Sequence, residues 1–114
     1  MKRGESYLAS FPFGDIPGMK LRPVLLLTGT IGPSSEVLVA YISSVMPSHL
    51  LFSDIVLDPN VPVHHQTALK TVSVLRLHKR ATIHATSLRR YLGQIAVVTQ
   101  EEVNAKLSAL LNLR

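Results

Sequence analysis

Apolar residues occur in short runs, separated by turn-forming residues, through the first three quarters of the chain. The run 5–11 is mixed and ends at Pro12, whereas 21–28 and 36–45 are almost wholly apolar. The segments between the runs are rich in glycine, proline and serine, which are typical of tight turns. An apolar run of this length, bounded by turns, indicates a strand that is buried on both faces.

The pattern continues with two further strands. A short one is predicted within 50–58, and a longer one within 69–84. The longer run alternates in part, and a strand turns successive side chains to opposite faces. Alternation places Arg76 beside His78 on one face and Lys79 on the other, as expected of a strand whose far end reaches the surface.

The last segment, 99–114, has the spacing of a helix. Thr99 and Glu102 stand three residues apart, which predicts a capping box at the helix start. Apolar residues recur at helical spacing and predict one buried stripe. They are Val103, Leu107, Leu110 and Leu111. A short helical turn is also expected within 86–92.

Together these elements predict a mainly β fold of the α+β class. We expect residues 1–114 to form one domain, a small barrel or curled sheet whose open end is covered by the C-terminal helix. The apolar content of 46% is enough for such a core.

The composition excludes several classes of protein. The chain has no cysteine, so it has neither a disulfide framework nor thiol catalysis, and a reducing cytoplasm is compatible with it. Its N-terminal segment does not predict a signal peptide, and no apolar run is long enough to span a bilayer. We expect a cytoplasmic protein that makes no use of a membrane.

The charge balance favours a polyanionic partner. The formal net charge is +5 and the sequence pI is about 10.0. Nucleic acid is the first expectation and an acidic protein the second.

No metal or cofactor site is predicted. His64 and His65 are adjacent, and adjacent side chains on an extended segment point apart. The sequence has no HExxH, no phosphate-binding glycine loop, no GxGxxG and no GxSxG.

Cationic and hydroxyl side chains do occur at the ends of the predicted strands. Arg22 stands at the start of an apolar run, next to Pro23, which fixes the backbone there. Its planar guanidinium matches a phosphate group and stays charged at any ordinary pH. Ser43 and Ser44 end the next apolar run, where their hydroxyls can donate to a phosphate oxygen.

The order of four segments along the chain is similar to that of a known family. They are KRGESYLASFPF, KLRPVLLLT, EVLVAYISSV and SVLRLHKRATI. By these segments the chain resembles the MazF/PemK family of bacterial toxin endoribonucleases, most of all its PemK-like branch. The resemblance implies an SH3-like small β-barrel of the MazF/CcdB type with a C-terminal α-helix, usually a homodimer.

The resemblance also implies an activity, that of an mRNA interferase. Such a toxin cleaves single-stranded RNA at short preferred sequences without a metal. The ribose 2′-hydroxyl attacks its own phosphodiester and leaves a 2′,3′-cyclic phosphate and a 5′-hydroxyl. The catalytic pair would be Arg22 and Ser43, and a cognate acidic antitoxin would bind the same basic groove.

Further contacts are expected around that pair. Lys20 and Ser44 are candidates for neighbouring phosphates, and His78 and Lys79 match strand positions that contact bases or phosphates in such toxins. Some family members carry a glutamate in the first loop as a possible base. Here the candidates for the general base are Asp15 and His78, and the sequence does not decide between them.

Two other readings compete with the nuclease. One is a non-catalytic SH3-like module that binds nucleic acid or poisons a protein target, as gyrase poisons do. The other is a degenerate copy of the toxin that has lost its activity.

Overall fold

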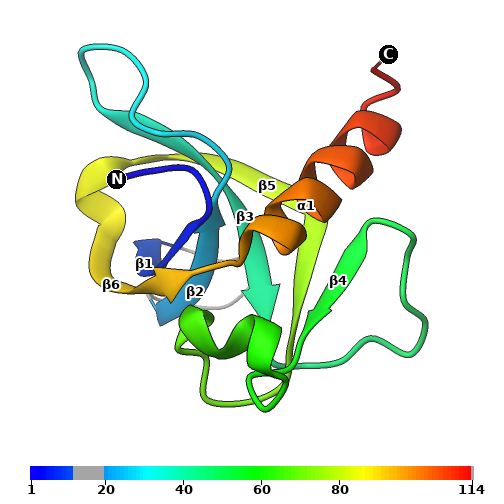
Figure 1. Cartoon of the computed structure of the whole chain (residues 1–114). Coiled ribbons are helices and arrows are strands. Elements are labelled where there is room, and N and C mark those ends of the chain that lie inside the picture. The colour runs from blue at the N-terminus through cyan, green and yellow to red at the C-terminus, as the bar shows by residue number, and fades with distance from the viewer. Residues whose placement is uncertain (12–19, 114) are drawn as a thin grey trace.

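The computed structural model describes residues 1–11 and 20–113, which form a β-sheet and one α-helix (Figure 1). The strands are β1 (Glu5–Phe11), β2 (Lys20–Leu26), β3 (Glu36–Ser43), β4 (Asp54–Leu57), β5 (Ser73–His84) and β6 (Leu88–Gln94). The helices are the 3-10 turns η1 (Pro62–Thr67) and η2 (Ala85–Ser87) and the α-helix α1 (Val97–Leu110).

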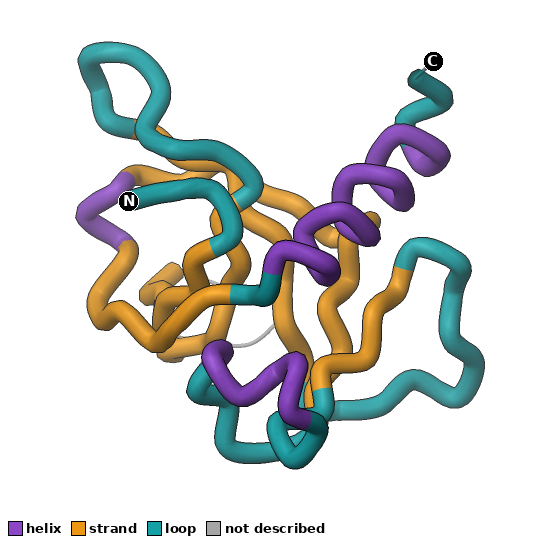
Figure 2. The backbone as a smooth tube through the Cα atoms, viewed as in Figure 1, coloured by secondary structure: helices purple, strands orange, loops and turns teal. Residues whose placement is uncertain are grey.

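The six strands form a single sheet in the order β4-β5-β3-β2-β1-β6, and every neighbouring pair is antiparallel. The strands gather into one curved layer, with α1 lying outside it (Figure 2). The prediction of a mainly β fold with a C-terminal helix is confirmed. The edge strands β4 and β6 do not pair with each other, so the sheet is open and not a closed barrel.

Both faces of the sheet are buried, which explains why the central strands are apolar throughout. Within β2, Leu25 packs in a core cluster on the α1 side, together with Val103 of that helix. The next residues on either side, Val24 and Leu26, pack in a second cluster on the opposite face. A strand alternates its side chains, so two buried faces require an unbroken apolar sequence.

The helix begins earlier than the sequence indicates. Its N-cap is Ala96, and no side chain caps it, so the predicted capping box between Thr99 and Glu102 is wrong. The start is set by backbone bonds instead: the Ile95 amide donates to the Gly4 carbonyl at 3.0 Å, and the Gln100 amide to the Ala96 carbonyl at 2.9 Å. Thr99 is buried inside the first turn.

The predicted apolar stripe of α1 is confirmed for three of its four residues. Val103 is fully buried, and Leu107 and Leu110 pack against the same core. Leu111 follows the helix as its C-cap and is exposed.

The segment 86–92 forms a strand and not the expected helical turn. Only Thr86 and Ser87 belong to the 3-10 turn η2, and β6 starts at Leu88. This strand pairs with β1 at the sheet edge and exposes Arg89 and Arg90. An edge strand with one solvated face has no apolar run to reveal it.

Within the described residues, no helix combines the length and the apolar character that a membrane crossing requires.

Candidate functional site

The register of the sheet brings Arg22 and Ser43 to matching positions on neighbouring strands. The ladder between β2 and β3 pairs Leu26 with Val39 and ends with Val24 opposite Tyr41. Arg22 and Ser43 lie two residues beyond this last pair, so continuing the same antiparallel count would set them opposite each other. Side chains two positions apart share a face of the sheet. The register therefore places this pair on one face, just where the strands separate.

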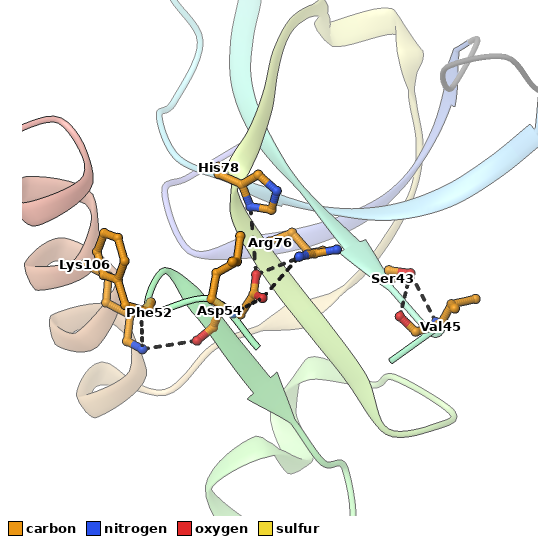
Figure 3. A network of polar contacts seen from close by, with 8 residues as sticks. Ser43, Val45, Phe52, Asp54, Arg76, His78 and Lys106 are labelled. Carbon is orange, nitrogen blue, oxygen red and sulfur yellow. Dashed lines mark hydrogen bonds and ion pairs between the residues drawn. The ribbon is translucent and has the colours of Figure 1, made fainter. Parts of the chain in front are cut away.

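The Ser43 hydroxyl is engaged in the turn that ends β3. It accepts a hydrogen bond from the Val45 amide at 3.1 Å, and it lies 3.3 Å from the Val45 carbonyl, to which it donates (Figure 3). These bonds fix the hydroxyl at the strand end. With a phosphate present, the hydroxyl could donate its hydrogen bond to a phosphate oxygen in place of the Val45 carbonyl. The hydrogen bond from the Val45 amide would still hold the hydroxyl oxygen in place.

A pocket of about 320 Å³ opens beside these strand ends. We call it the cationic pocket, since three of its lining residues are Arg22, Lys70 and Arg90. The other lining residues are Leu8, Pro23, Ile42, Ser44, Ala68, Leu69, Thr71, Ser73, Tyr91 and Leu92. Arg22 is thus the one member of the predicted catalytic pair among these lining residues, and Ser43 of β3, between Ile42 and Ser44 in the chain, is not among them.

A separate polar cluster lies between β4 and β5. The carboxylate of Asp54 accepts from Arg76 Nε at 3.1 Å and from Arg76 Nη2 at 3.3 Å. His78 Nδ1 lies 3.9 Å from Asp54 Oδ1. Lys106 of α1 donates to the Asp54 carbonyl at 3.1 Å. We call these four residues the Asp54 network, and Figure 3 shows it apart from the Ser43–Val45 turn.

An irregularity of β5 sets the position of His78. Ala40 pairs with Arg80, but the next residue, Tyr41, pairs with Arg76. The three residues 77–79 therefore lie between successive register pairs, a bulge that redirects their side chains. Arg80 Nη1 donates to the Leu77 carbonyl across this bulge at 2.9 Å.

The Asp54 network holds its carboxylate ionised. Burial by itself would raise the pKa of Asp54, yet the pKa is lowered. The hydrogen bond from the Leu51 amide, 2.9 Å long, and the bonds and charge of Arg76 outweigh the burial. The carboxylate is completely buried, so this is an internal ion pair.

His78 is held neutral by the same surroundings. Burial lowers its pKa, and the charge of Arg76 lowers it further. The Asp54 charge opposes this shift without reversing it. Nδ1 of His78 is buried and has no hydrogen-bond partner among the described residues.

The predicted site residues thus fall into separate groups. Arg22 and Ser44 line the cationic pocket, and Ser43, next to Ser44 in the chain, is not among the lining residues. His78 belongs to the Asp54 network and does not line the pocket. Lys20, at the start of β2, and Lys79, in the β5 bulge, are exposed and also lie outside its lining. Asp15 lies outside the described residues.

Within residues 1–11 and 20–113, no three histidine, aspartate or glutamate residues gather as metal ligands do.

The sequence matches the model of one protein family along nearly its whole length. That model describes the PemK-like, MazF-like toxin of type II toxin–antitoxin systems, and it matches residues 2–111. The chain belongs to this toxin family. The expected resemblance to MazF and PemK toxins is confirmed.

Solved toxin structures share the fold of this PemK-like toxin. The Mycobacterium tuberculosis toxin MazF-mt6 aligns with a TM-score of 0.72 and 20% identity, covering 98% of this chain and 99% of that one. The MazE–MazF crystal structure from Deinococcus radiodurans aligns with a TM-score of 0.73 and 17% identity, covering 100% and 98%. An endoribonuclease in complex with its cognate antitoxin, from a mycobacterial species, gives 0.69 and 16%, covering 100% and 97%.

No curated protein matches the toxin closely enough to count as a relative.

Three residues that line the pocket were not predicted from the sequence as site residues. Lys70 precedes β5 in a loop, and Arg90 and Tyr91 lie on β6, the strand that was not predicted. The one available signal was the Arg89–Arg90–Tyr91 run, two cations next to an aromatic residue. It becomes informative only when the pairing of β6 with β1 brings it to the sheet edge, one strand away from β2.

Proposed function

We propose that this PemK-like toxin is a metal-independent endoribonuclease that cuts single-stranded RNA at short preferred sequences. Family membership supports a toxin, and similarly folded proteins are named endoribonucleases. The observation that carries the proposal is the state of Arg22. Arg22 is one of the residues that line the cationic pocket, and no carboxylate among the described residues pairs with its guanidinium. A half-buried charge without a protein counterion is available to an anionic ligand.

The cleavage uses the nucleophile that the RNA itself supplies. The 2′-oxygen attacks the neighbouring phosphorus, and the bond from phosphorus to the 5′-oxygen breaks. The 2′-proton passes to a base, and the departing 5′-oxygen takes up a proton. The products are a 2′,3′-cyclic phosphate and a 5′-hydroxyl, and DNA is no substrate because it lacks the attacking group.

Arg22 and Ser43 act on the phosphate as it becomes more anionic. Negative charge grows on the non-bridging oxygens in the transition state, so a fixed cation and a fixed hydroxyl stabilise that state more than the bound substrate. Arg22 is a poor proton donor near neutral pH, and its role is therefore electrostatic. The Ser43 hydroxyl donates a hydrogen bond to a phosphate oxygen and keeps its proton, while the Val45 amide donates to the hydroxyl oxygen.

Two side chains are candidates for the base that takes the 2′-proton. His78 has a lowered pKa, which keeps it unprotonated at neutral pH, but it contacts the Asp54 network and not the pocket. Asp15 belongs to the first loop. The variants His78→Gln and Asp15→Asn separate them, since only loss of the true base removes the ascending acid limb of the pH–rate profile.

The proposed partners follow from charge and from the solved neighbours. Two of those neighbours are complexes of a toxin with its antitoxin. We propose that this toxin also binds an acidic antitoxin, which its net charge of +5 favours, and that it forms a homodimer. Its place would be the cytoplasm, where its RNA substrate is found.

Incubation of the purified toxin with single-stranded RNA in EDTA tests the proposal. Discrete cuts that carry 2′,3′-cyclic phosphate and 5′-hydroxyl ends are expected. RNA that stays intact while binding is demonstrated would instead favour a non-catalytic binding module. Cleavage that EDTA abolishes, and that added Mg²⁺ restores, would contradict the metal-independent mechanism.

A further inference from the structure

The cationic pocket holds more positive charge than one phosphate requires. Arg22 comes from β2, Lys70 from the loop before β5, and Arg90 from β6. Across the part of the chain that the structure describes, none of the three side chains forms an ion pair or a hydrogen bond. Other cations of the toxin are partnered, such as Arg76 with Asp54 and Lys106 with Glu102. The described lining residues include no carboxylate, and such a set of cations favours an anionic ligand.

The remaining lining is unlike that of a site for a bare inorganic anion. Several apolar side chains contribute to it, Leu8, Pro23, Ile42, Leu69 and Leu92. Tyr91, an aromatic residue that is 50% exposed, also lines the pocket. Apolar and aromatic surface beside convergent charges suits a ligand that has both a flat apolar part and a negative part.

Tyr91 is held in place by a contact with Tyr7. Its ring meets that of Tyr7 edge to face, with centroids 5.5 Å apart and planes at 75°. The Tyr7 hydroxyl in turn donates to Glu5 Oε1 at 3.3 Å. A ring fixed in this way loses little freedom on binding, so it can serve as a stacking platform for a base.

We propose that the cationic pocket holds the nucleotide next to the scissile phosphate, with Lys70 and Arg90 on its phosphate and Tyr91 stacked on its base. This inference rests on the proposed function and extends it to residues outside the catalytic pair. The pocket volume of about 320 Å³ lies near the lower end of small-ligand sites and suits a single nucleotide. Arg22 connects the two sites, because it lines the pocket and is also the cation of the proposed catalytic pair.

Two hydroxyls are placed to read the nucleotide. Ser44 and Thr71 line the pocket, and neither side chain makes a hydrogen bond within the described residues. Ser73, by contrast, already donates to the Thr71 carbonyl at 3.0 Å. Free hydroxyls both donate and accept, so these two can bind a base edge or a ribose hydroxyl.

A binding assay tests the electrostatic half of the proposal. Once the cleavage site is mapped, an RNA with a 2′-deoxy residue there stays intact and reports affinity alone. Lys70→Ala and Arg90→Ala should each weaken its binding about tenfold and reduce the slope of log affinity against log salt by about 0.7, the value for one phosphate contact on a single strand. Arg89→Ala is the matched control, an exposed arginine on the same strand outside the lining, and should bind like the wild type.

A mutant cycle tests the stacking half. Tyr91→Ala is combined with RNAs that carry an abasic residue at each successive position around the cut. At one position, adjacent to the scissile phosphate, the wild type should bind the abasic RNA about tenfold more weakly than intact RNA. The variant should bind the abasic and the intact RNA equally at that position. Tyr91→Phe keeps the ring and should behave like the wild type. Circular dichroism confirms that each variant is folded.

The outcomes separate this inference from the proposed function. If the wild type cuts RNA while Lys70→Ala and Arg90→Ala both bind within twofold of it, the pocket assignment is wrong and the nuclease stands. If Tyr91→Ala responds to every abasic position as the wild type does, the stacking role is wrong. If the wild type neither binds nor cuts RNA, both proposals fail together.

Discussion

At the scale of single residues, the toxin separates cations that stabilise the fold from cations that are available to a ligand. Arg76 shares two hydrogen bonds with the buried carboxylate of Asp54. Arg22, Lys70 and Arg90 have no carboxylate partner among the described residues. A paired internal charge that loses its partner is costly, whereas a solvated one is not. Substitutions of the two kinds should therefore act on different properties, stability in the first case and RNA binding in the second.

Removing Asp54 should destabilise the toxin strongly. Asp54→Ala leaves the Arg76 guanidinium without its counterion, on a side chain of which only 16% is exposed. The loss should be about 3 kcal/mol in the free energy of unfolding, at the lower end of the range for a broken internal ion pair. Urea denaturation measures it. Glu101→Gln is the control, an exposed helix carboxylate whose replacement should change stability by less than about 0.5 kcal/mol; an equal loss in the two variants would refute the role of the network.

His78 should make the toxin less stable in mild acid. Its pKa is lower in the folded state than in the unfolded chain, so the unfolded chain binds the proton more tightly. Stability is therefore complete above the unfolded pKa of about 6.5 and falls as the pH drops below it towards the folded pKa. His78→Gln should lack this fall when unfolding is measured from pH 8 to pH 5. Parallel profiles for the variant and the wild type would contradict it.

At the scale of elements, the turn η1 is fitted closely against β6. A Cβ atom on Gly93 would come within 1.9 Å of the Gln66 carbonyl oxygen, a backbone atom that cannot rotate away. Ser6, which pairs with Gly93, also donates from its hydroxyl to the Thr67 carbonyl at 3.3 Å. The two elements therefore meet backbone to backbone, and the loop that follows η1 carries Lys70 towards the pocket.

Gly93→Ala should force η1 away from the sheet. The overlap should cost at least about 2 kcal/mol in the free energy of unfolding, in the range of overpacked cores, and should also weaken RNA binding by displacing Lys70. Thermal unfolding followed by circular dichroism measures the first effect. At Gly29 the nearest atom to an added Cβ is 3.5 Å away, so Gly29→Ala should be close to neutral. A neutral Gly93→Ala would show that η1 is not held there.

The elements that the sequence predicts are those whose burial leaves a pattern. Strands β2 and β3 are apolar throughout because both of their faces are buried, and α1 shows its core stripe. Strand β6 has no such pattern, since its pairing with β1 depends on backbone bonds at an exposed edge. The predicted start of α1 was wrong for a similar reason. A backbone hydrogen bond from Ile95 to Gly4 sets the start, and the Thr99 side chain does not cap it.

The same contrast explains what the sequence indicates about the site. Arg22, Ser43 and Ser44 adjoin apolar strands, and motif order connects them with a toxin family. Lys70, Arg90 and Tyr91 are contributed by a loop and an edge strand that reach the pocket only through tertiary pairing. The run of two arginines and a tyrosine, 89–91, is their one local signal, and by itself it does not distinguish a binding site from an ordinary solvated surface.

At the scale of the whole molecule, the net charge of +5 and the three pocket cations predict salt-sensitive binding of single-stranded RNA. Each phosphate neutralised on a single strand contributes about 0.7 to the slope of log affinity against log salt. Three contacts predict about a twentyfold loss of affinity between 50 and 200 mM salt. Fluorescence anisotropy with uncleavable RNA measures it, and affinity that does not change with salt would contradict phosphate recognition by the pocket.

The most direct test of the account is the rate of RNA cleavage by Arg22→Ala under single-turnover conditions in EDTA. Removal of one fixed group that stabilises transition-state charge lowers the rate by about 10²–10³. We predict a loss of that size, with an unchanged melting temperature and with uncleavable RNA still bound. Cleavage by Arg22→Ala at the wild-type rate, with the same cyclic-phosphate ends, would contradict the central claim that the Arg22 guanidinium stabilises the scissile phosphate.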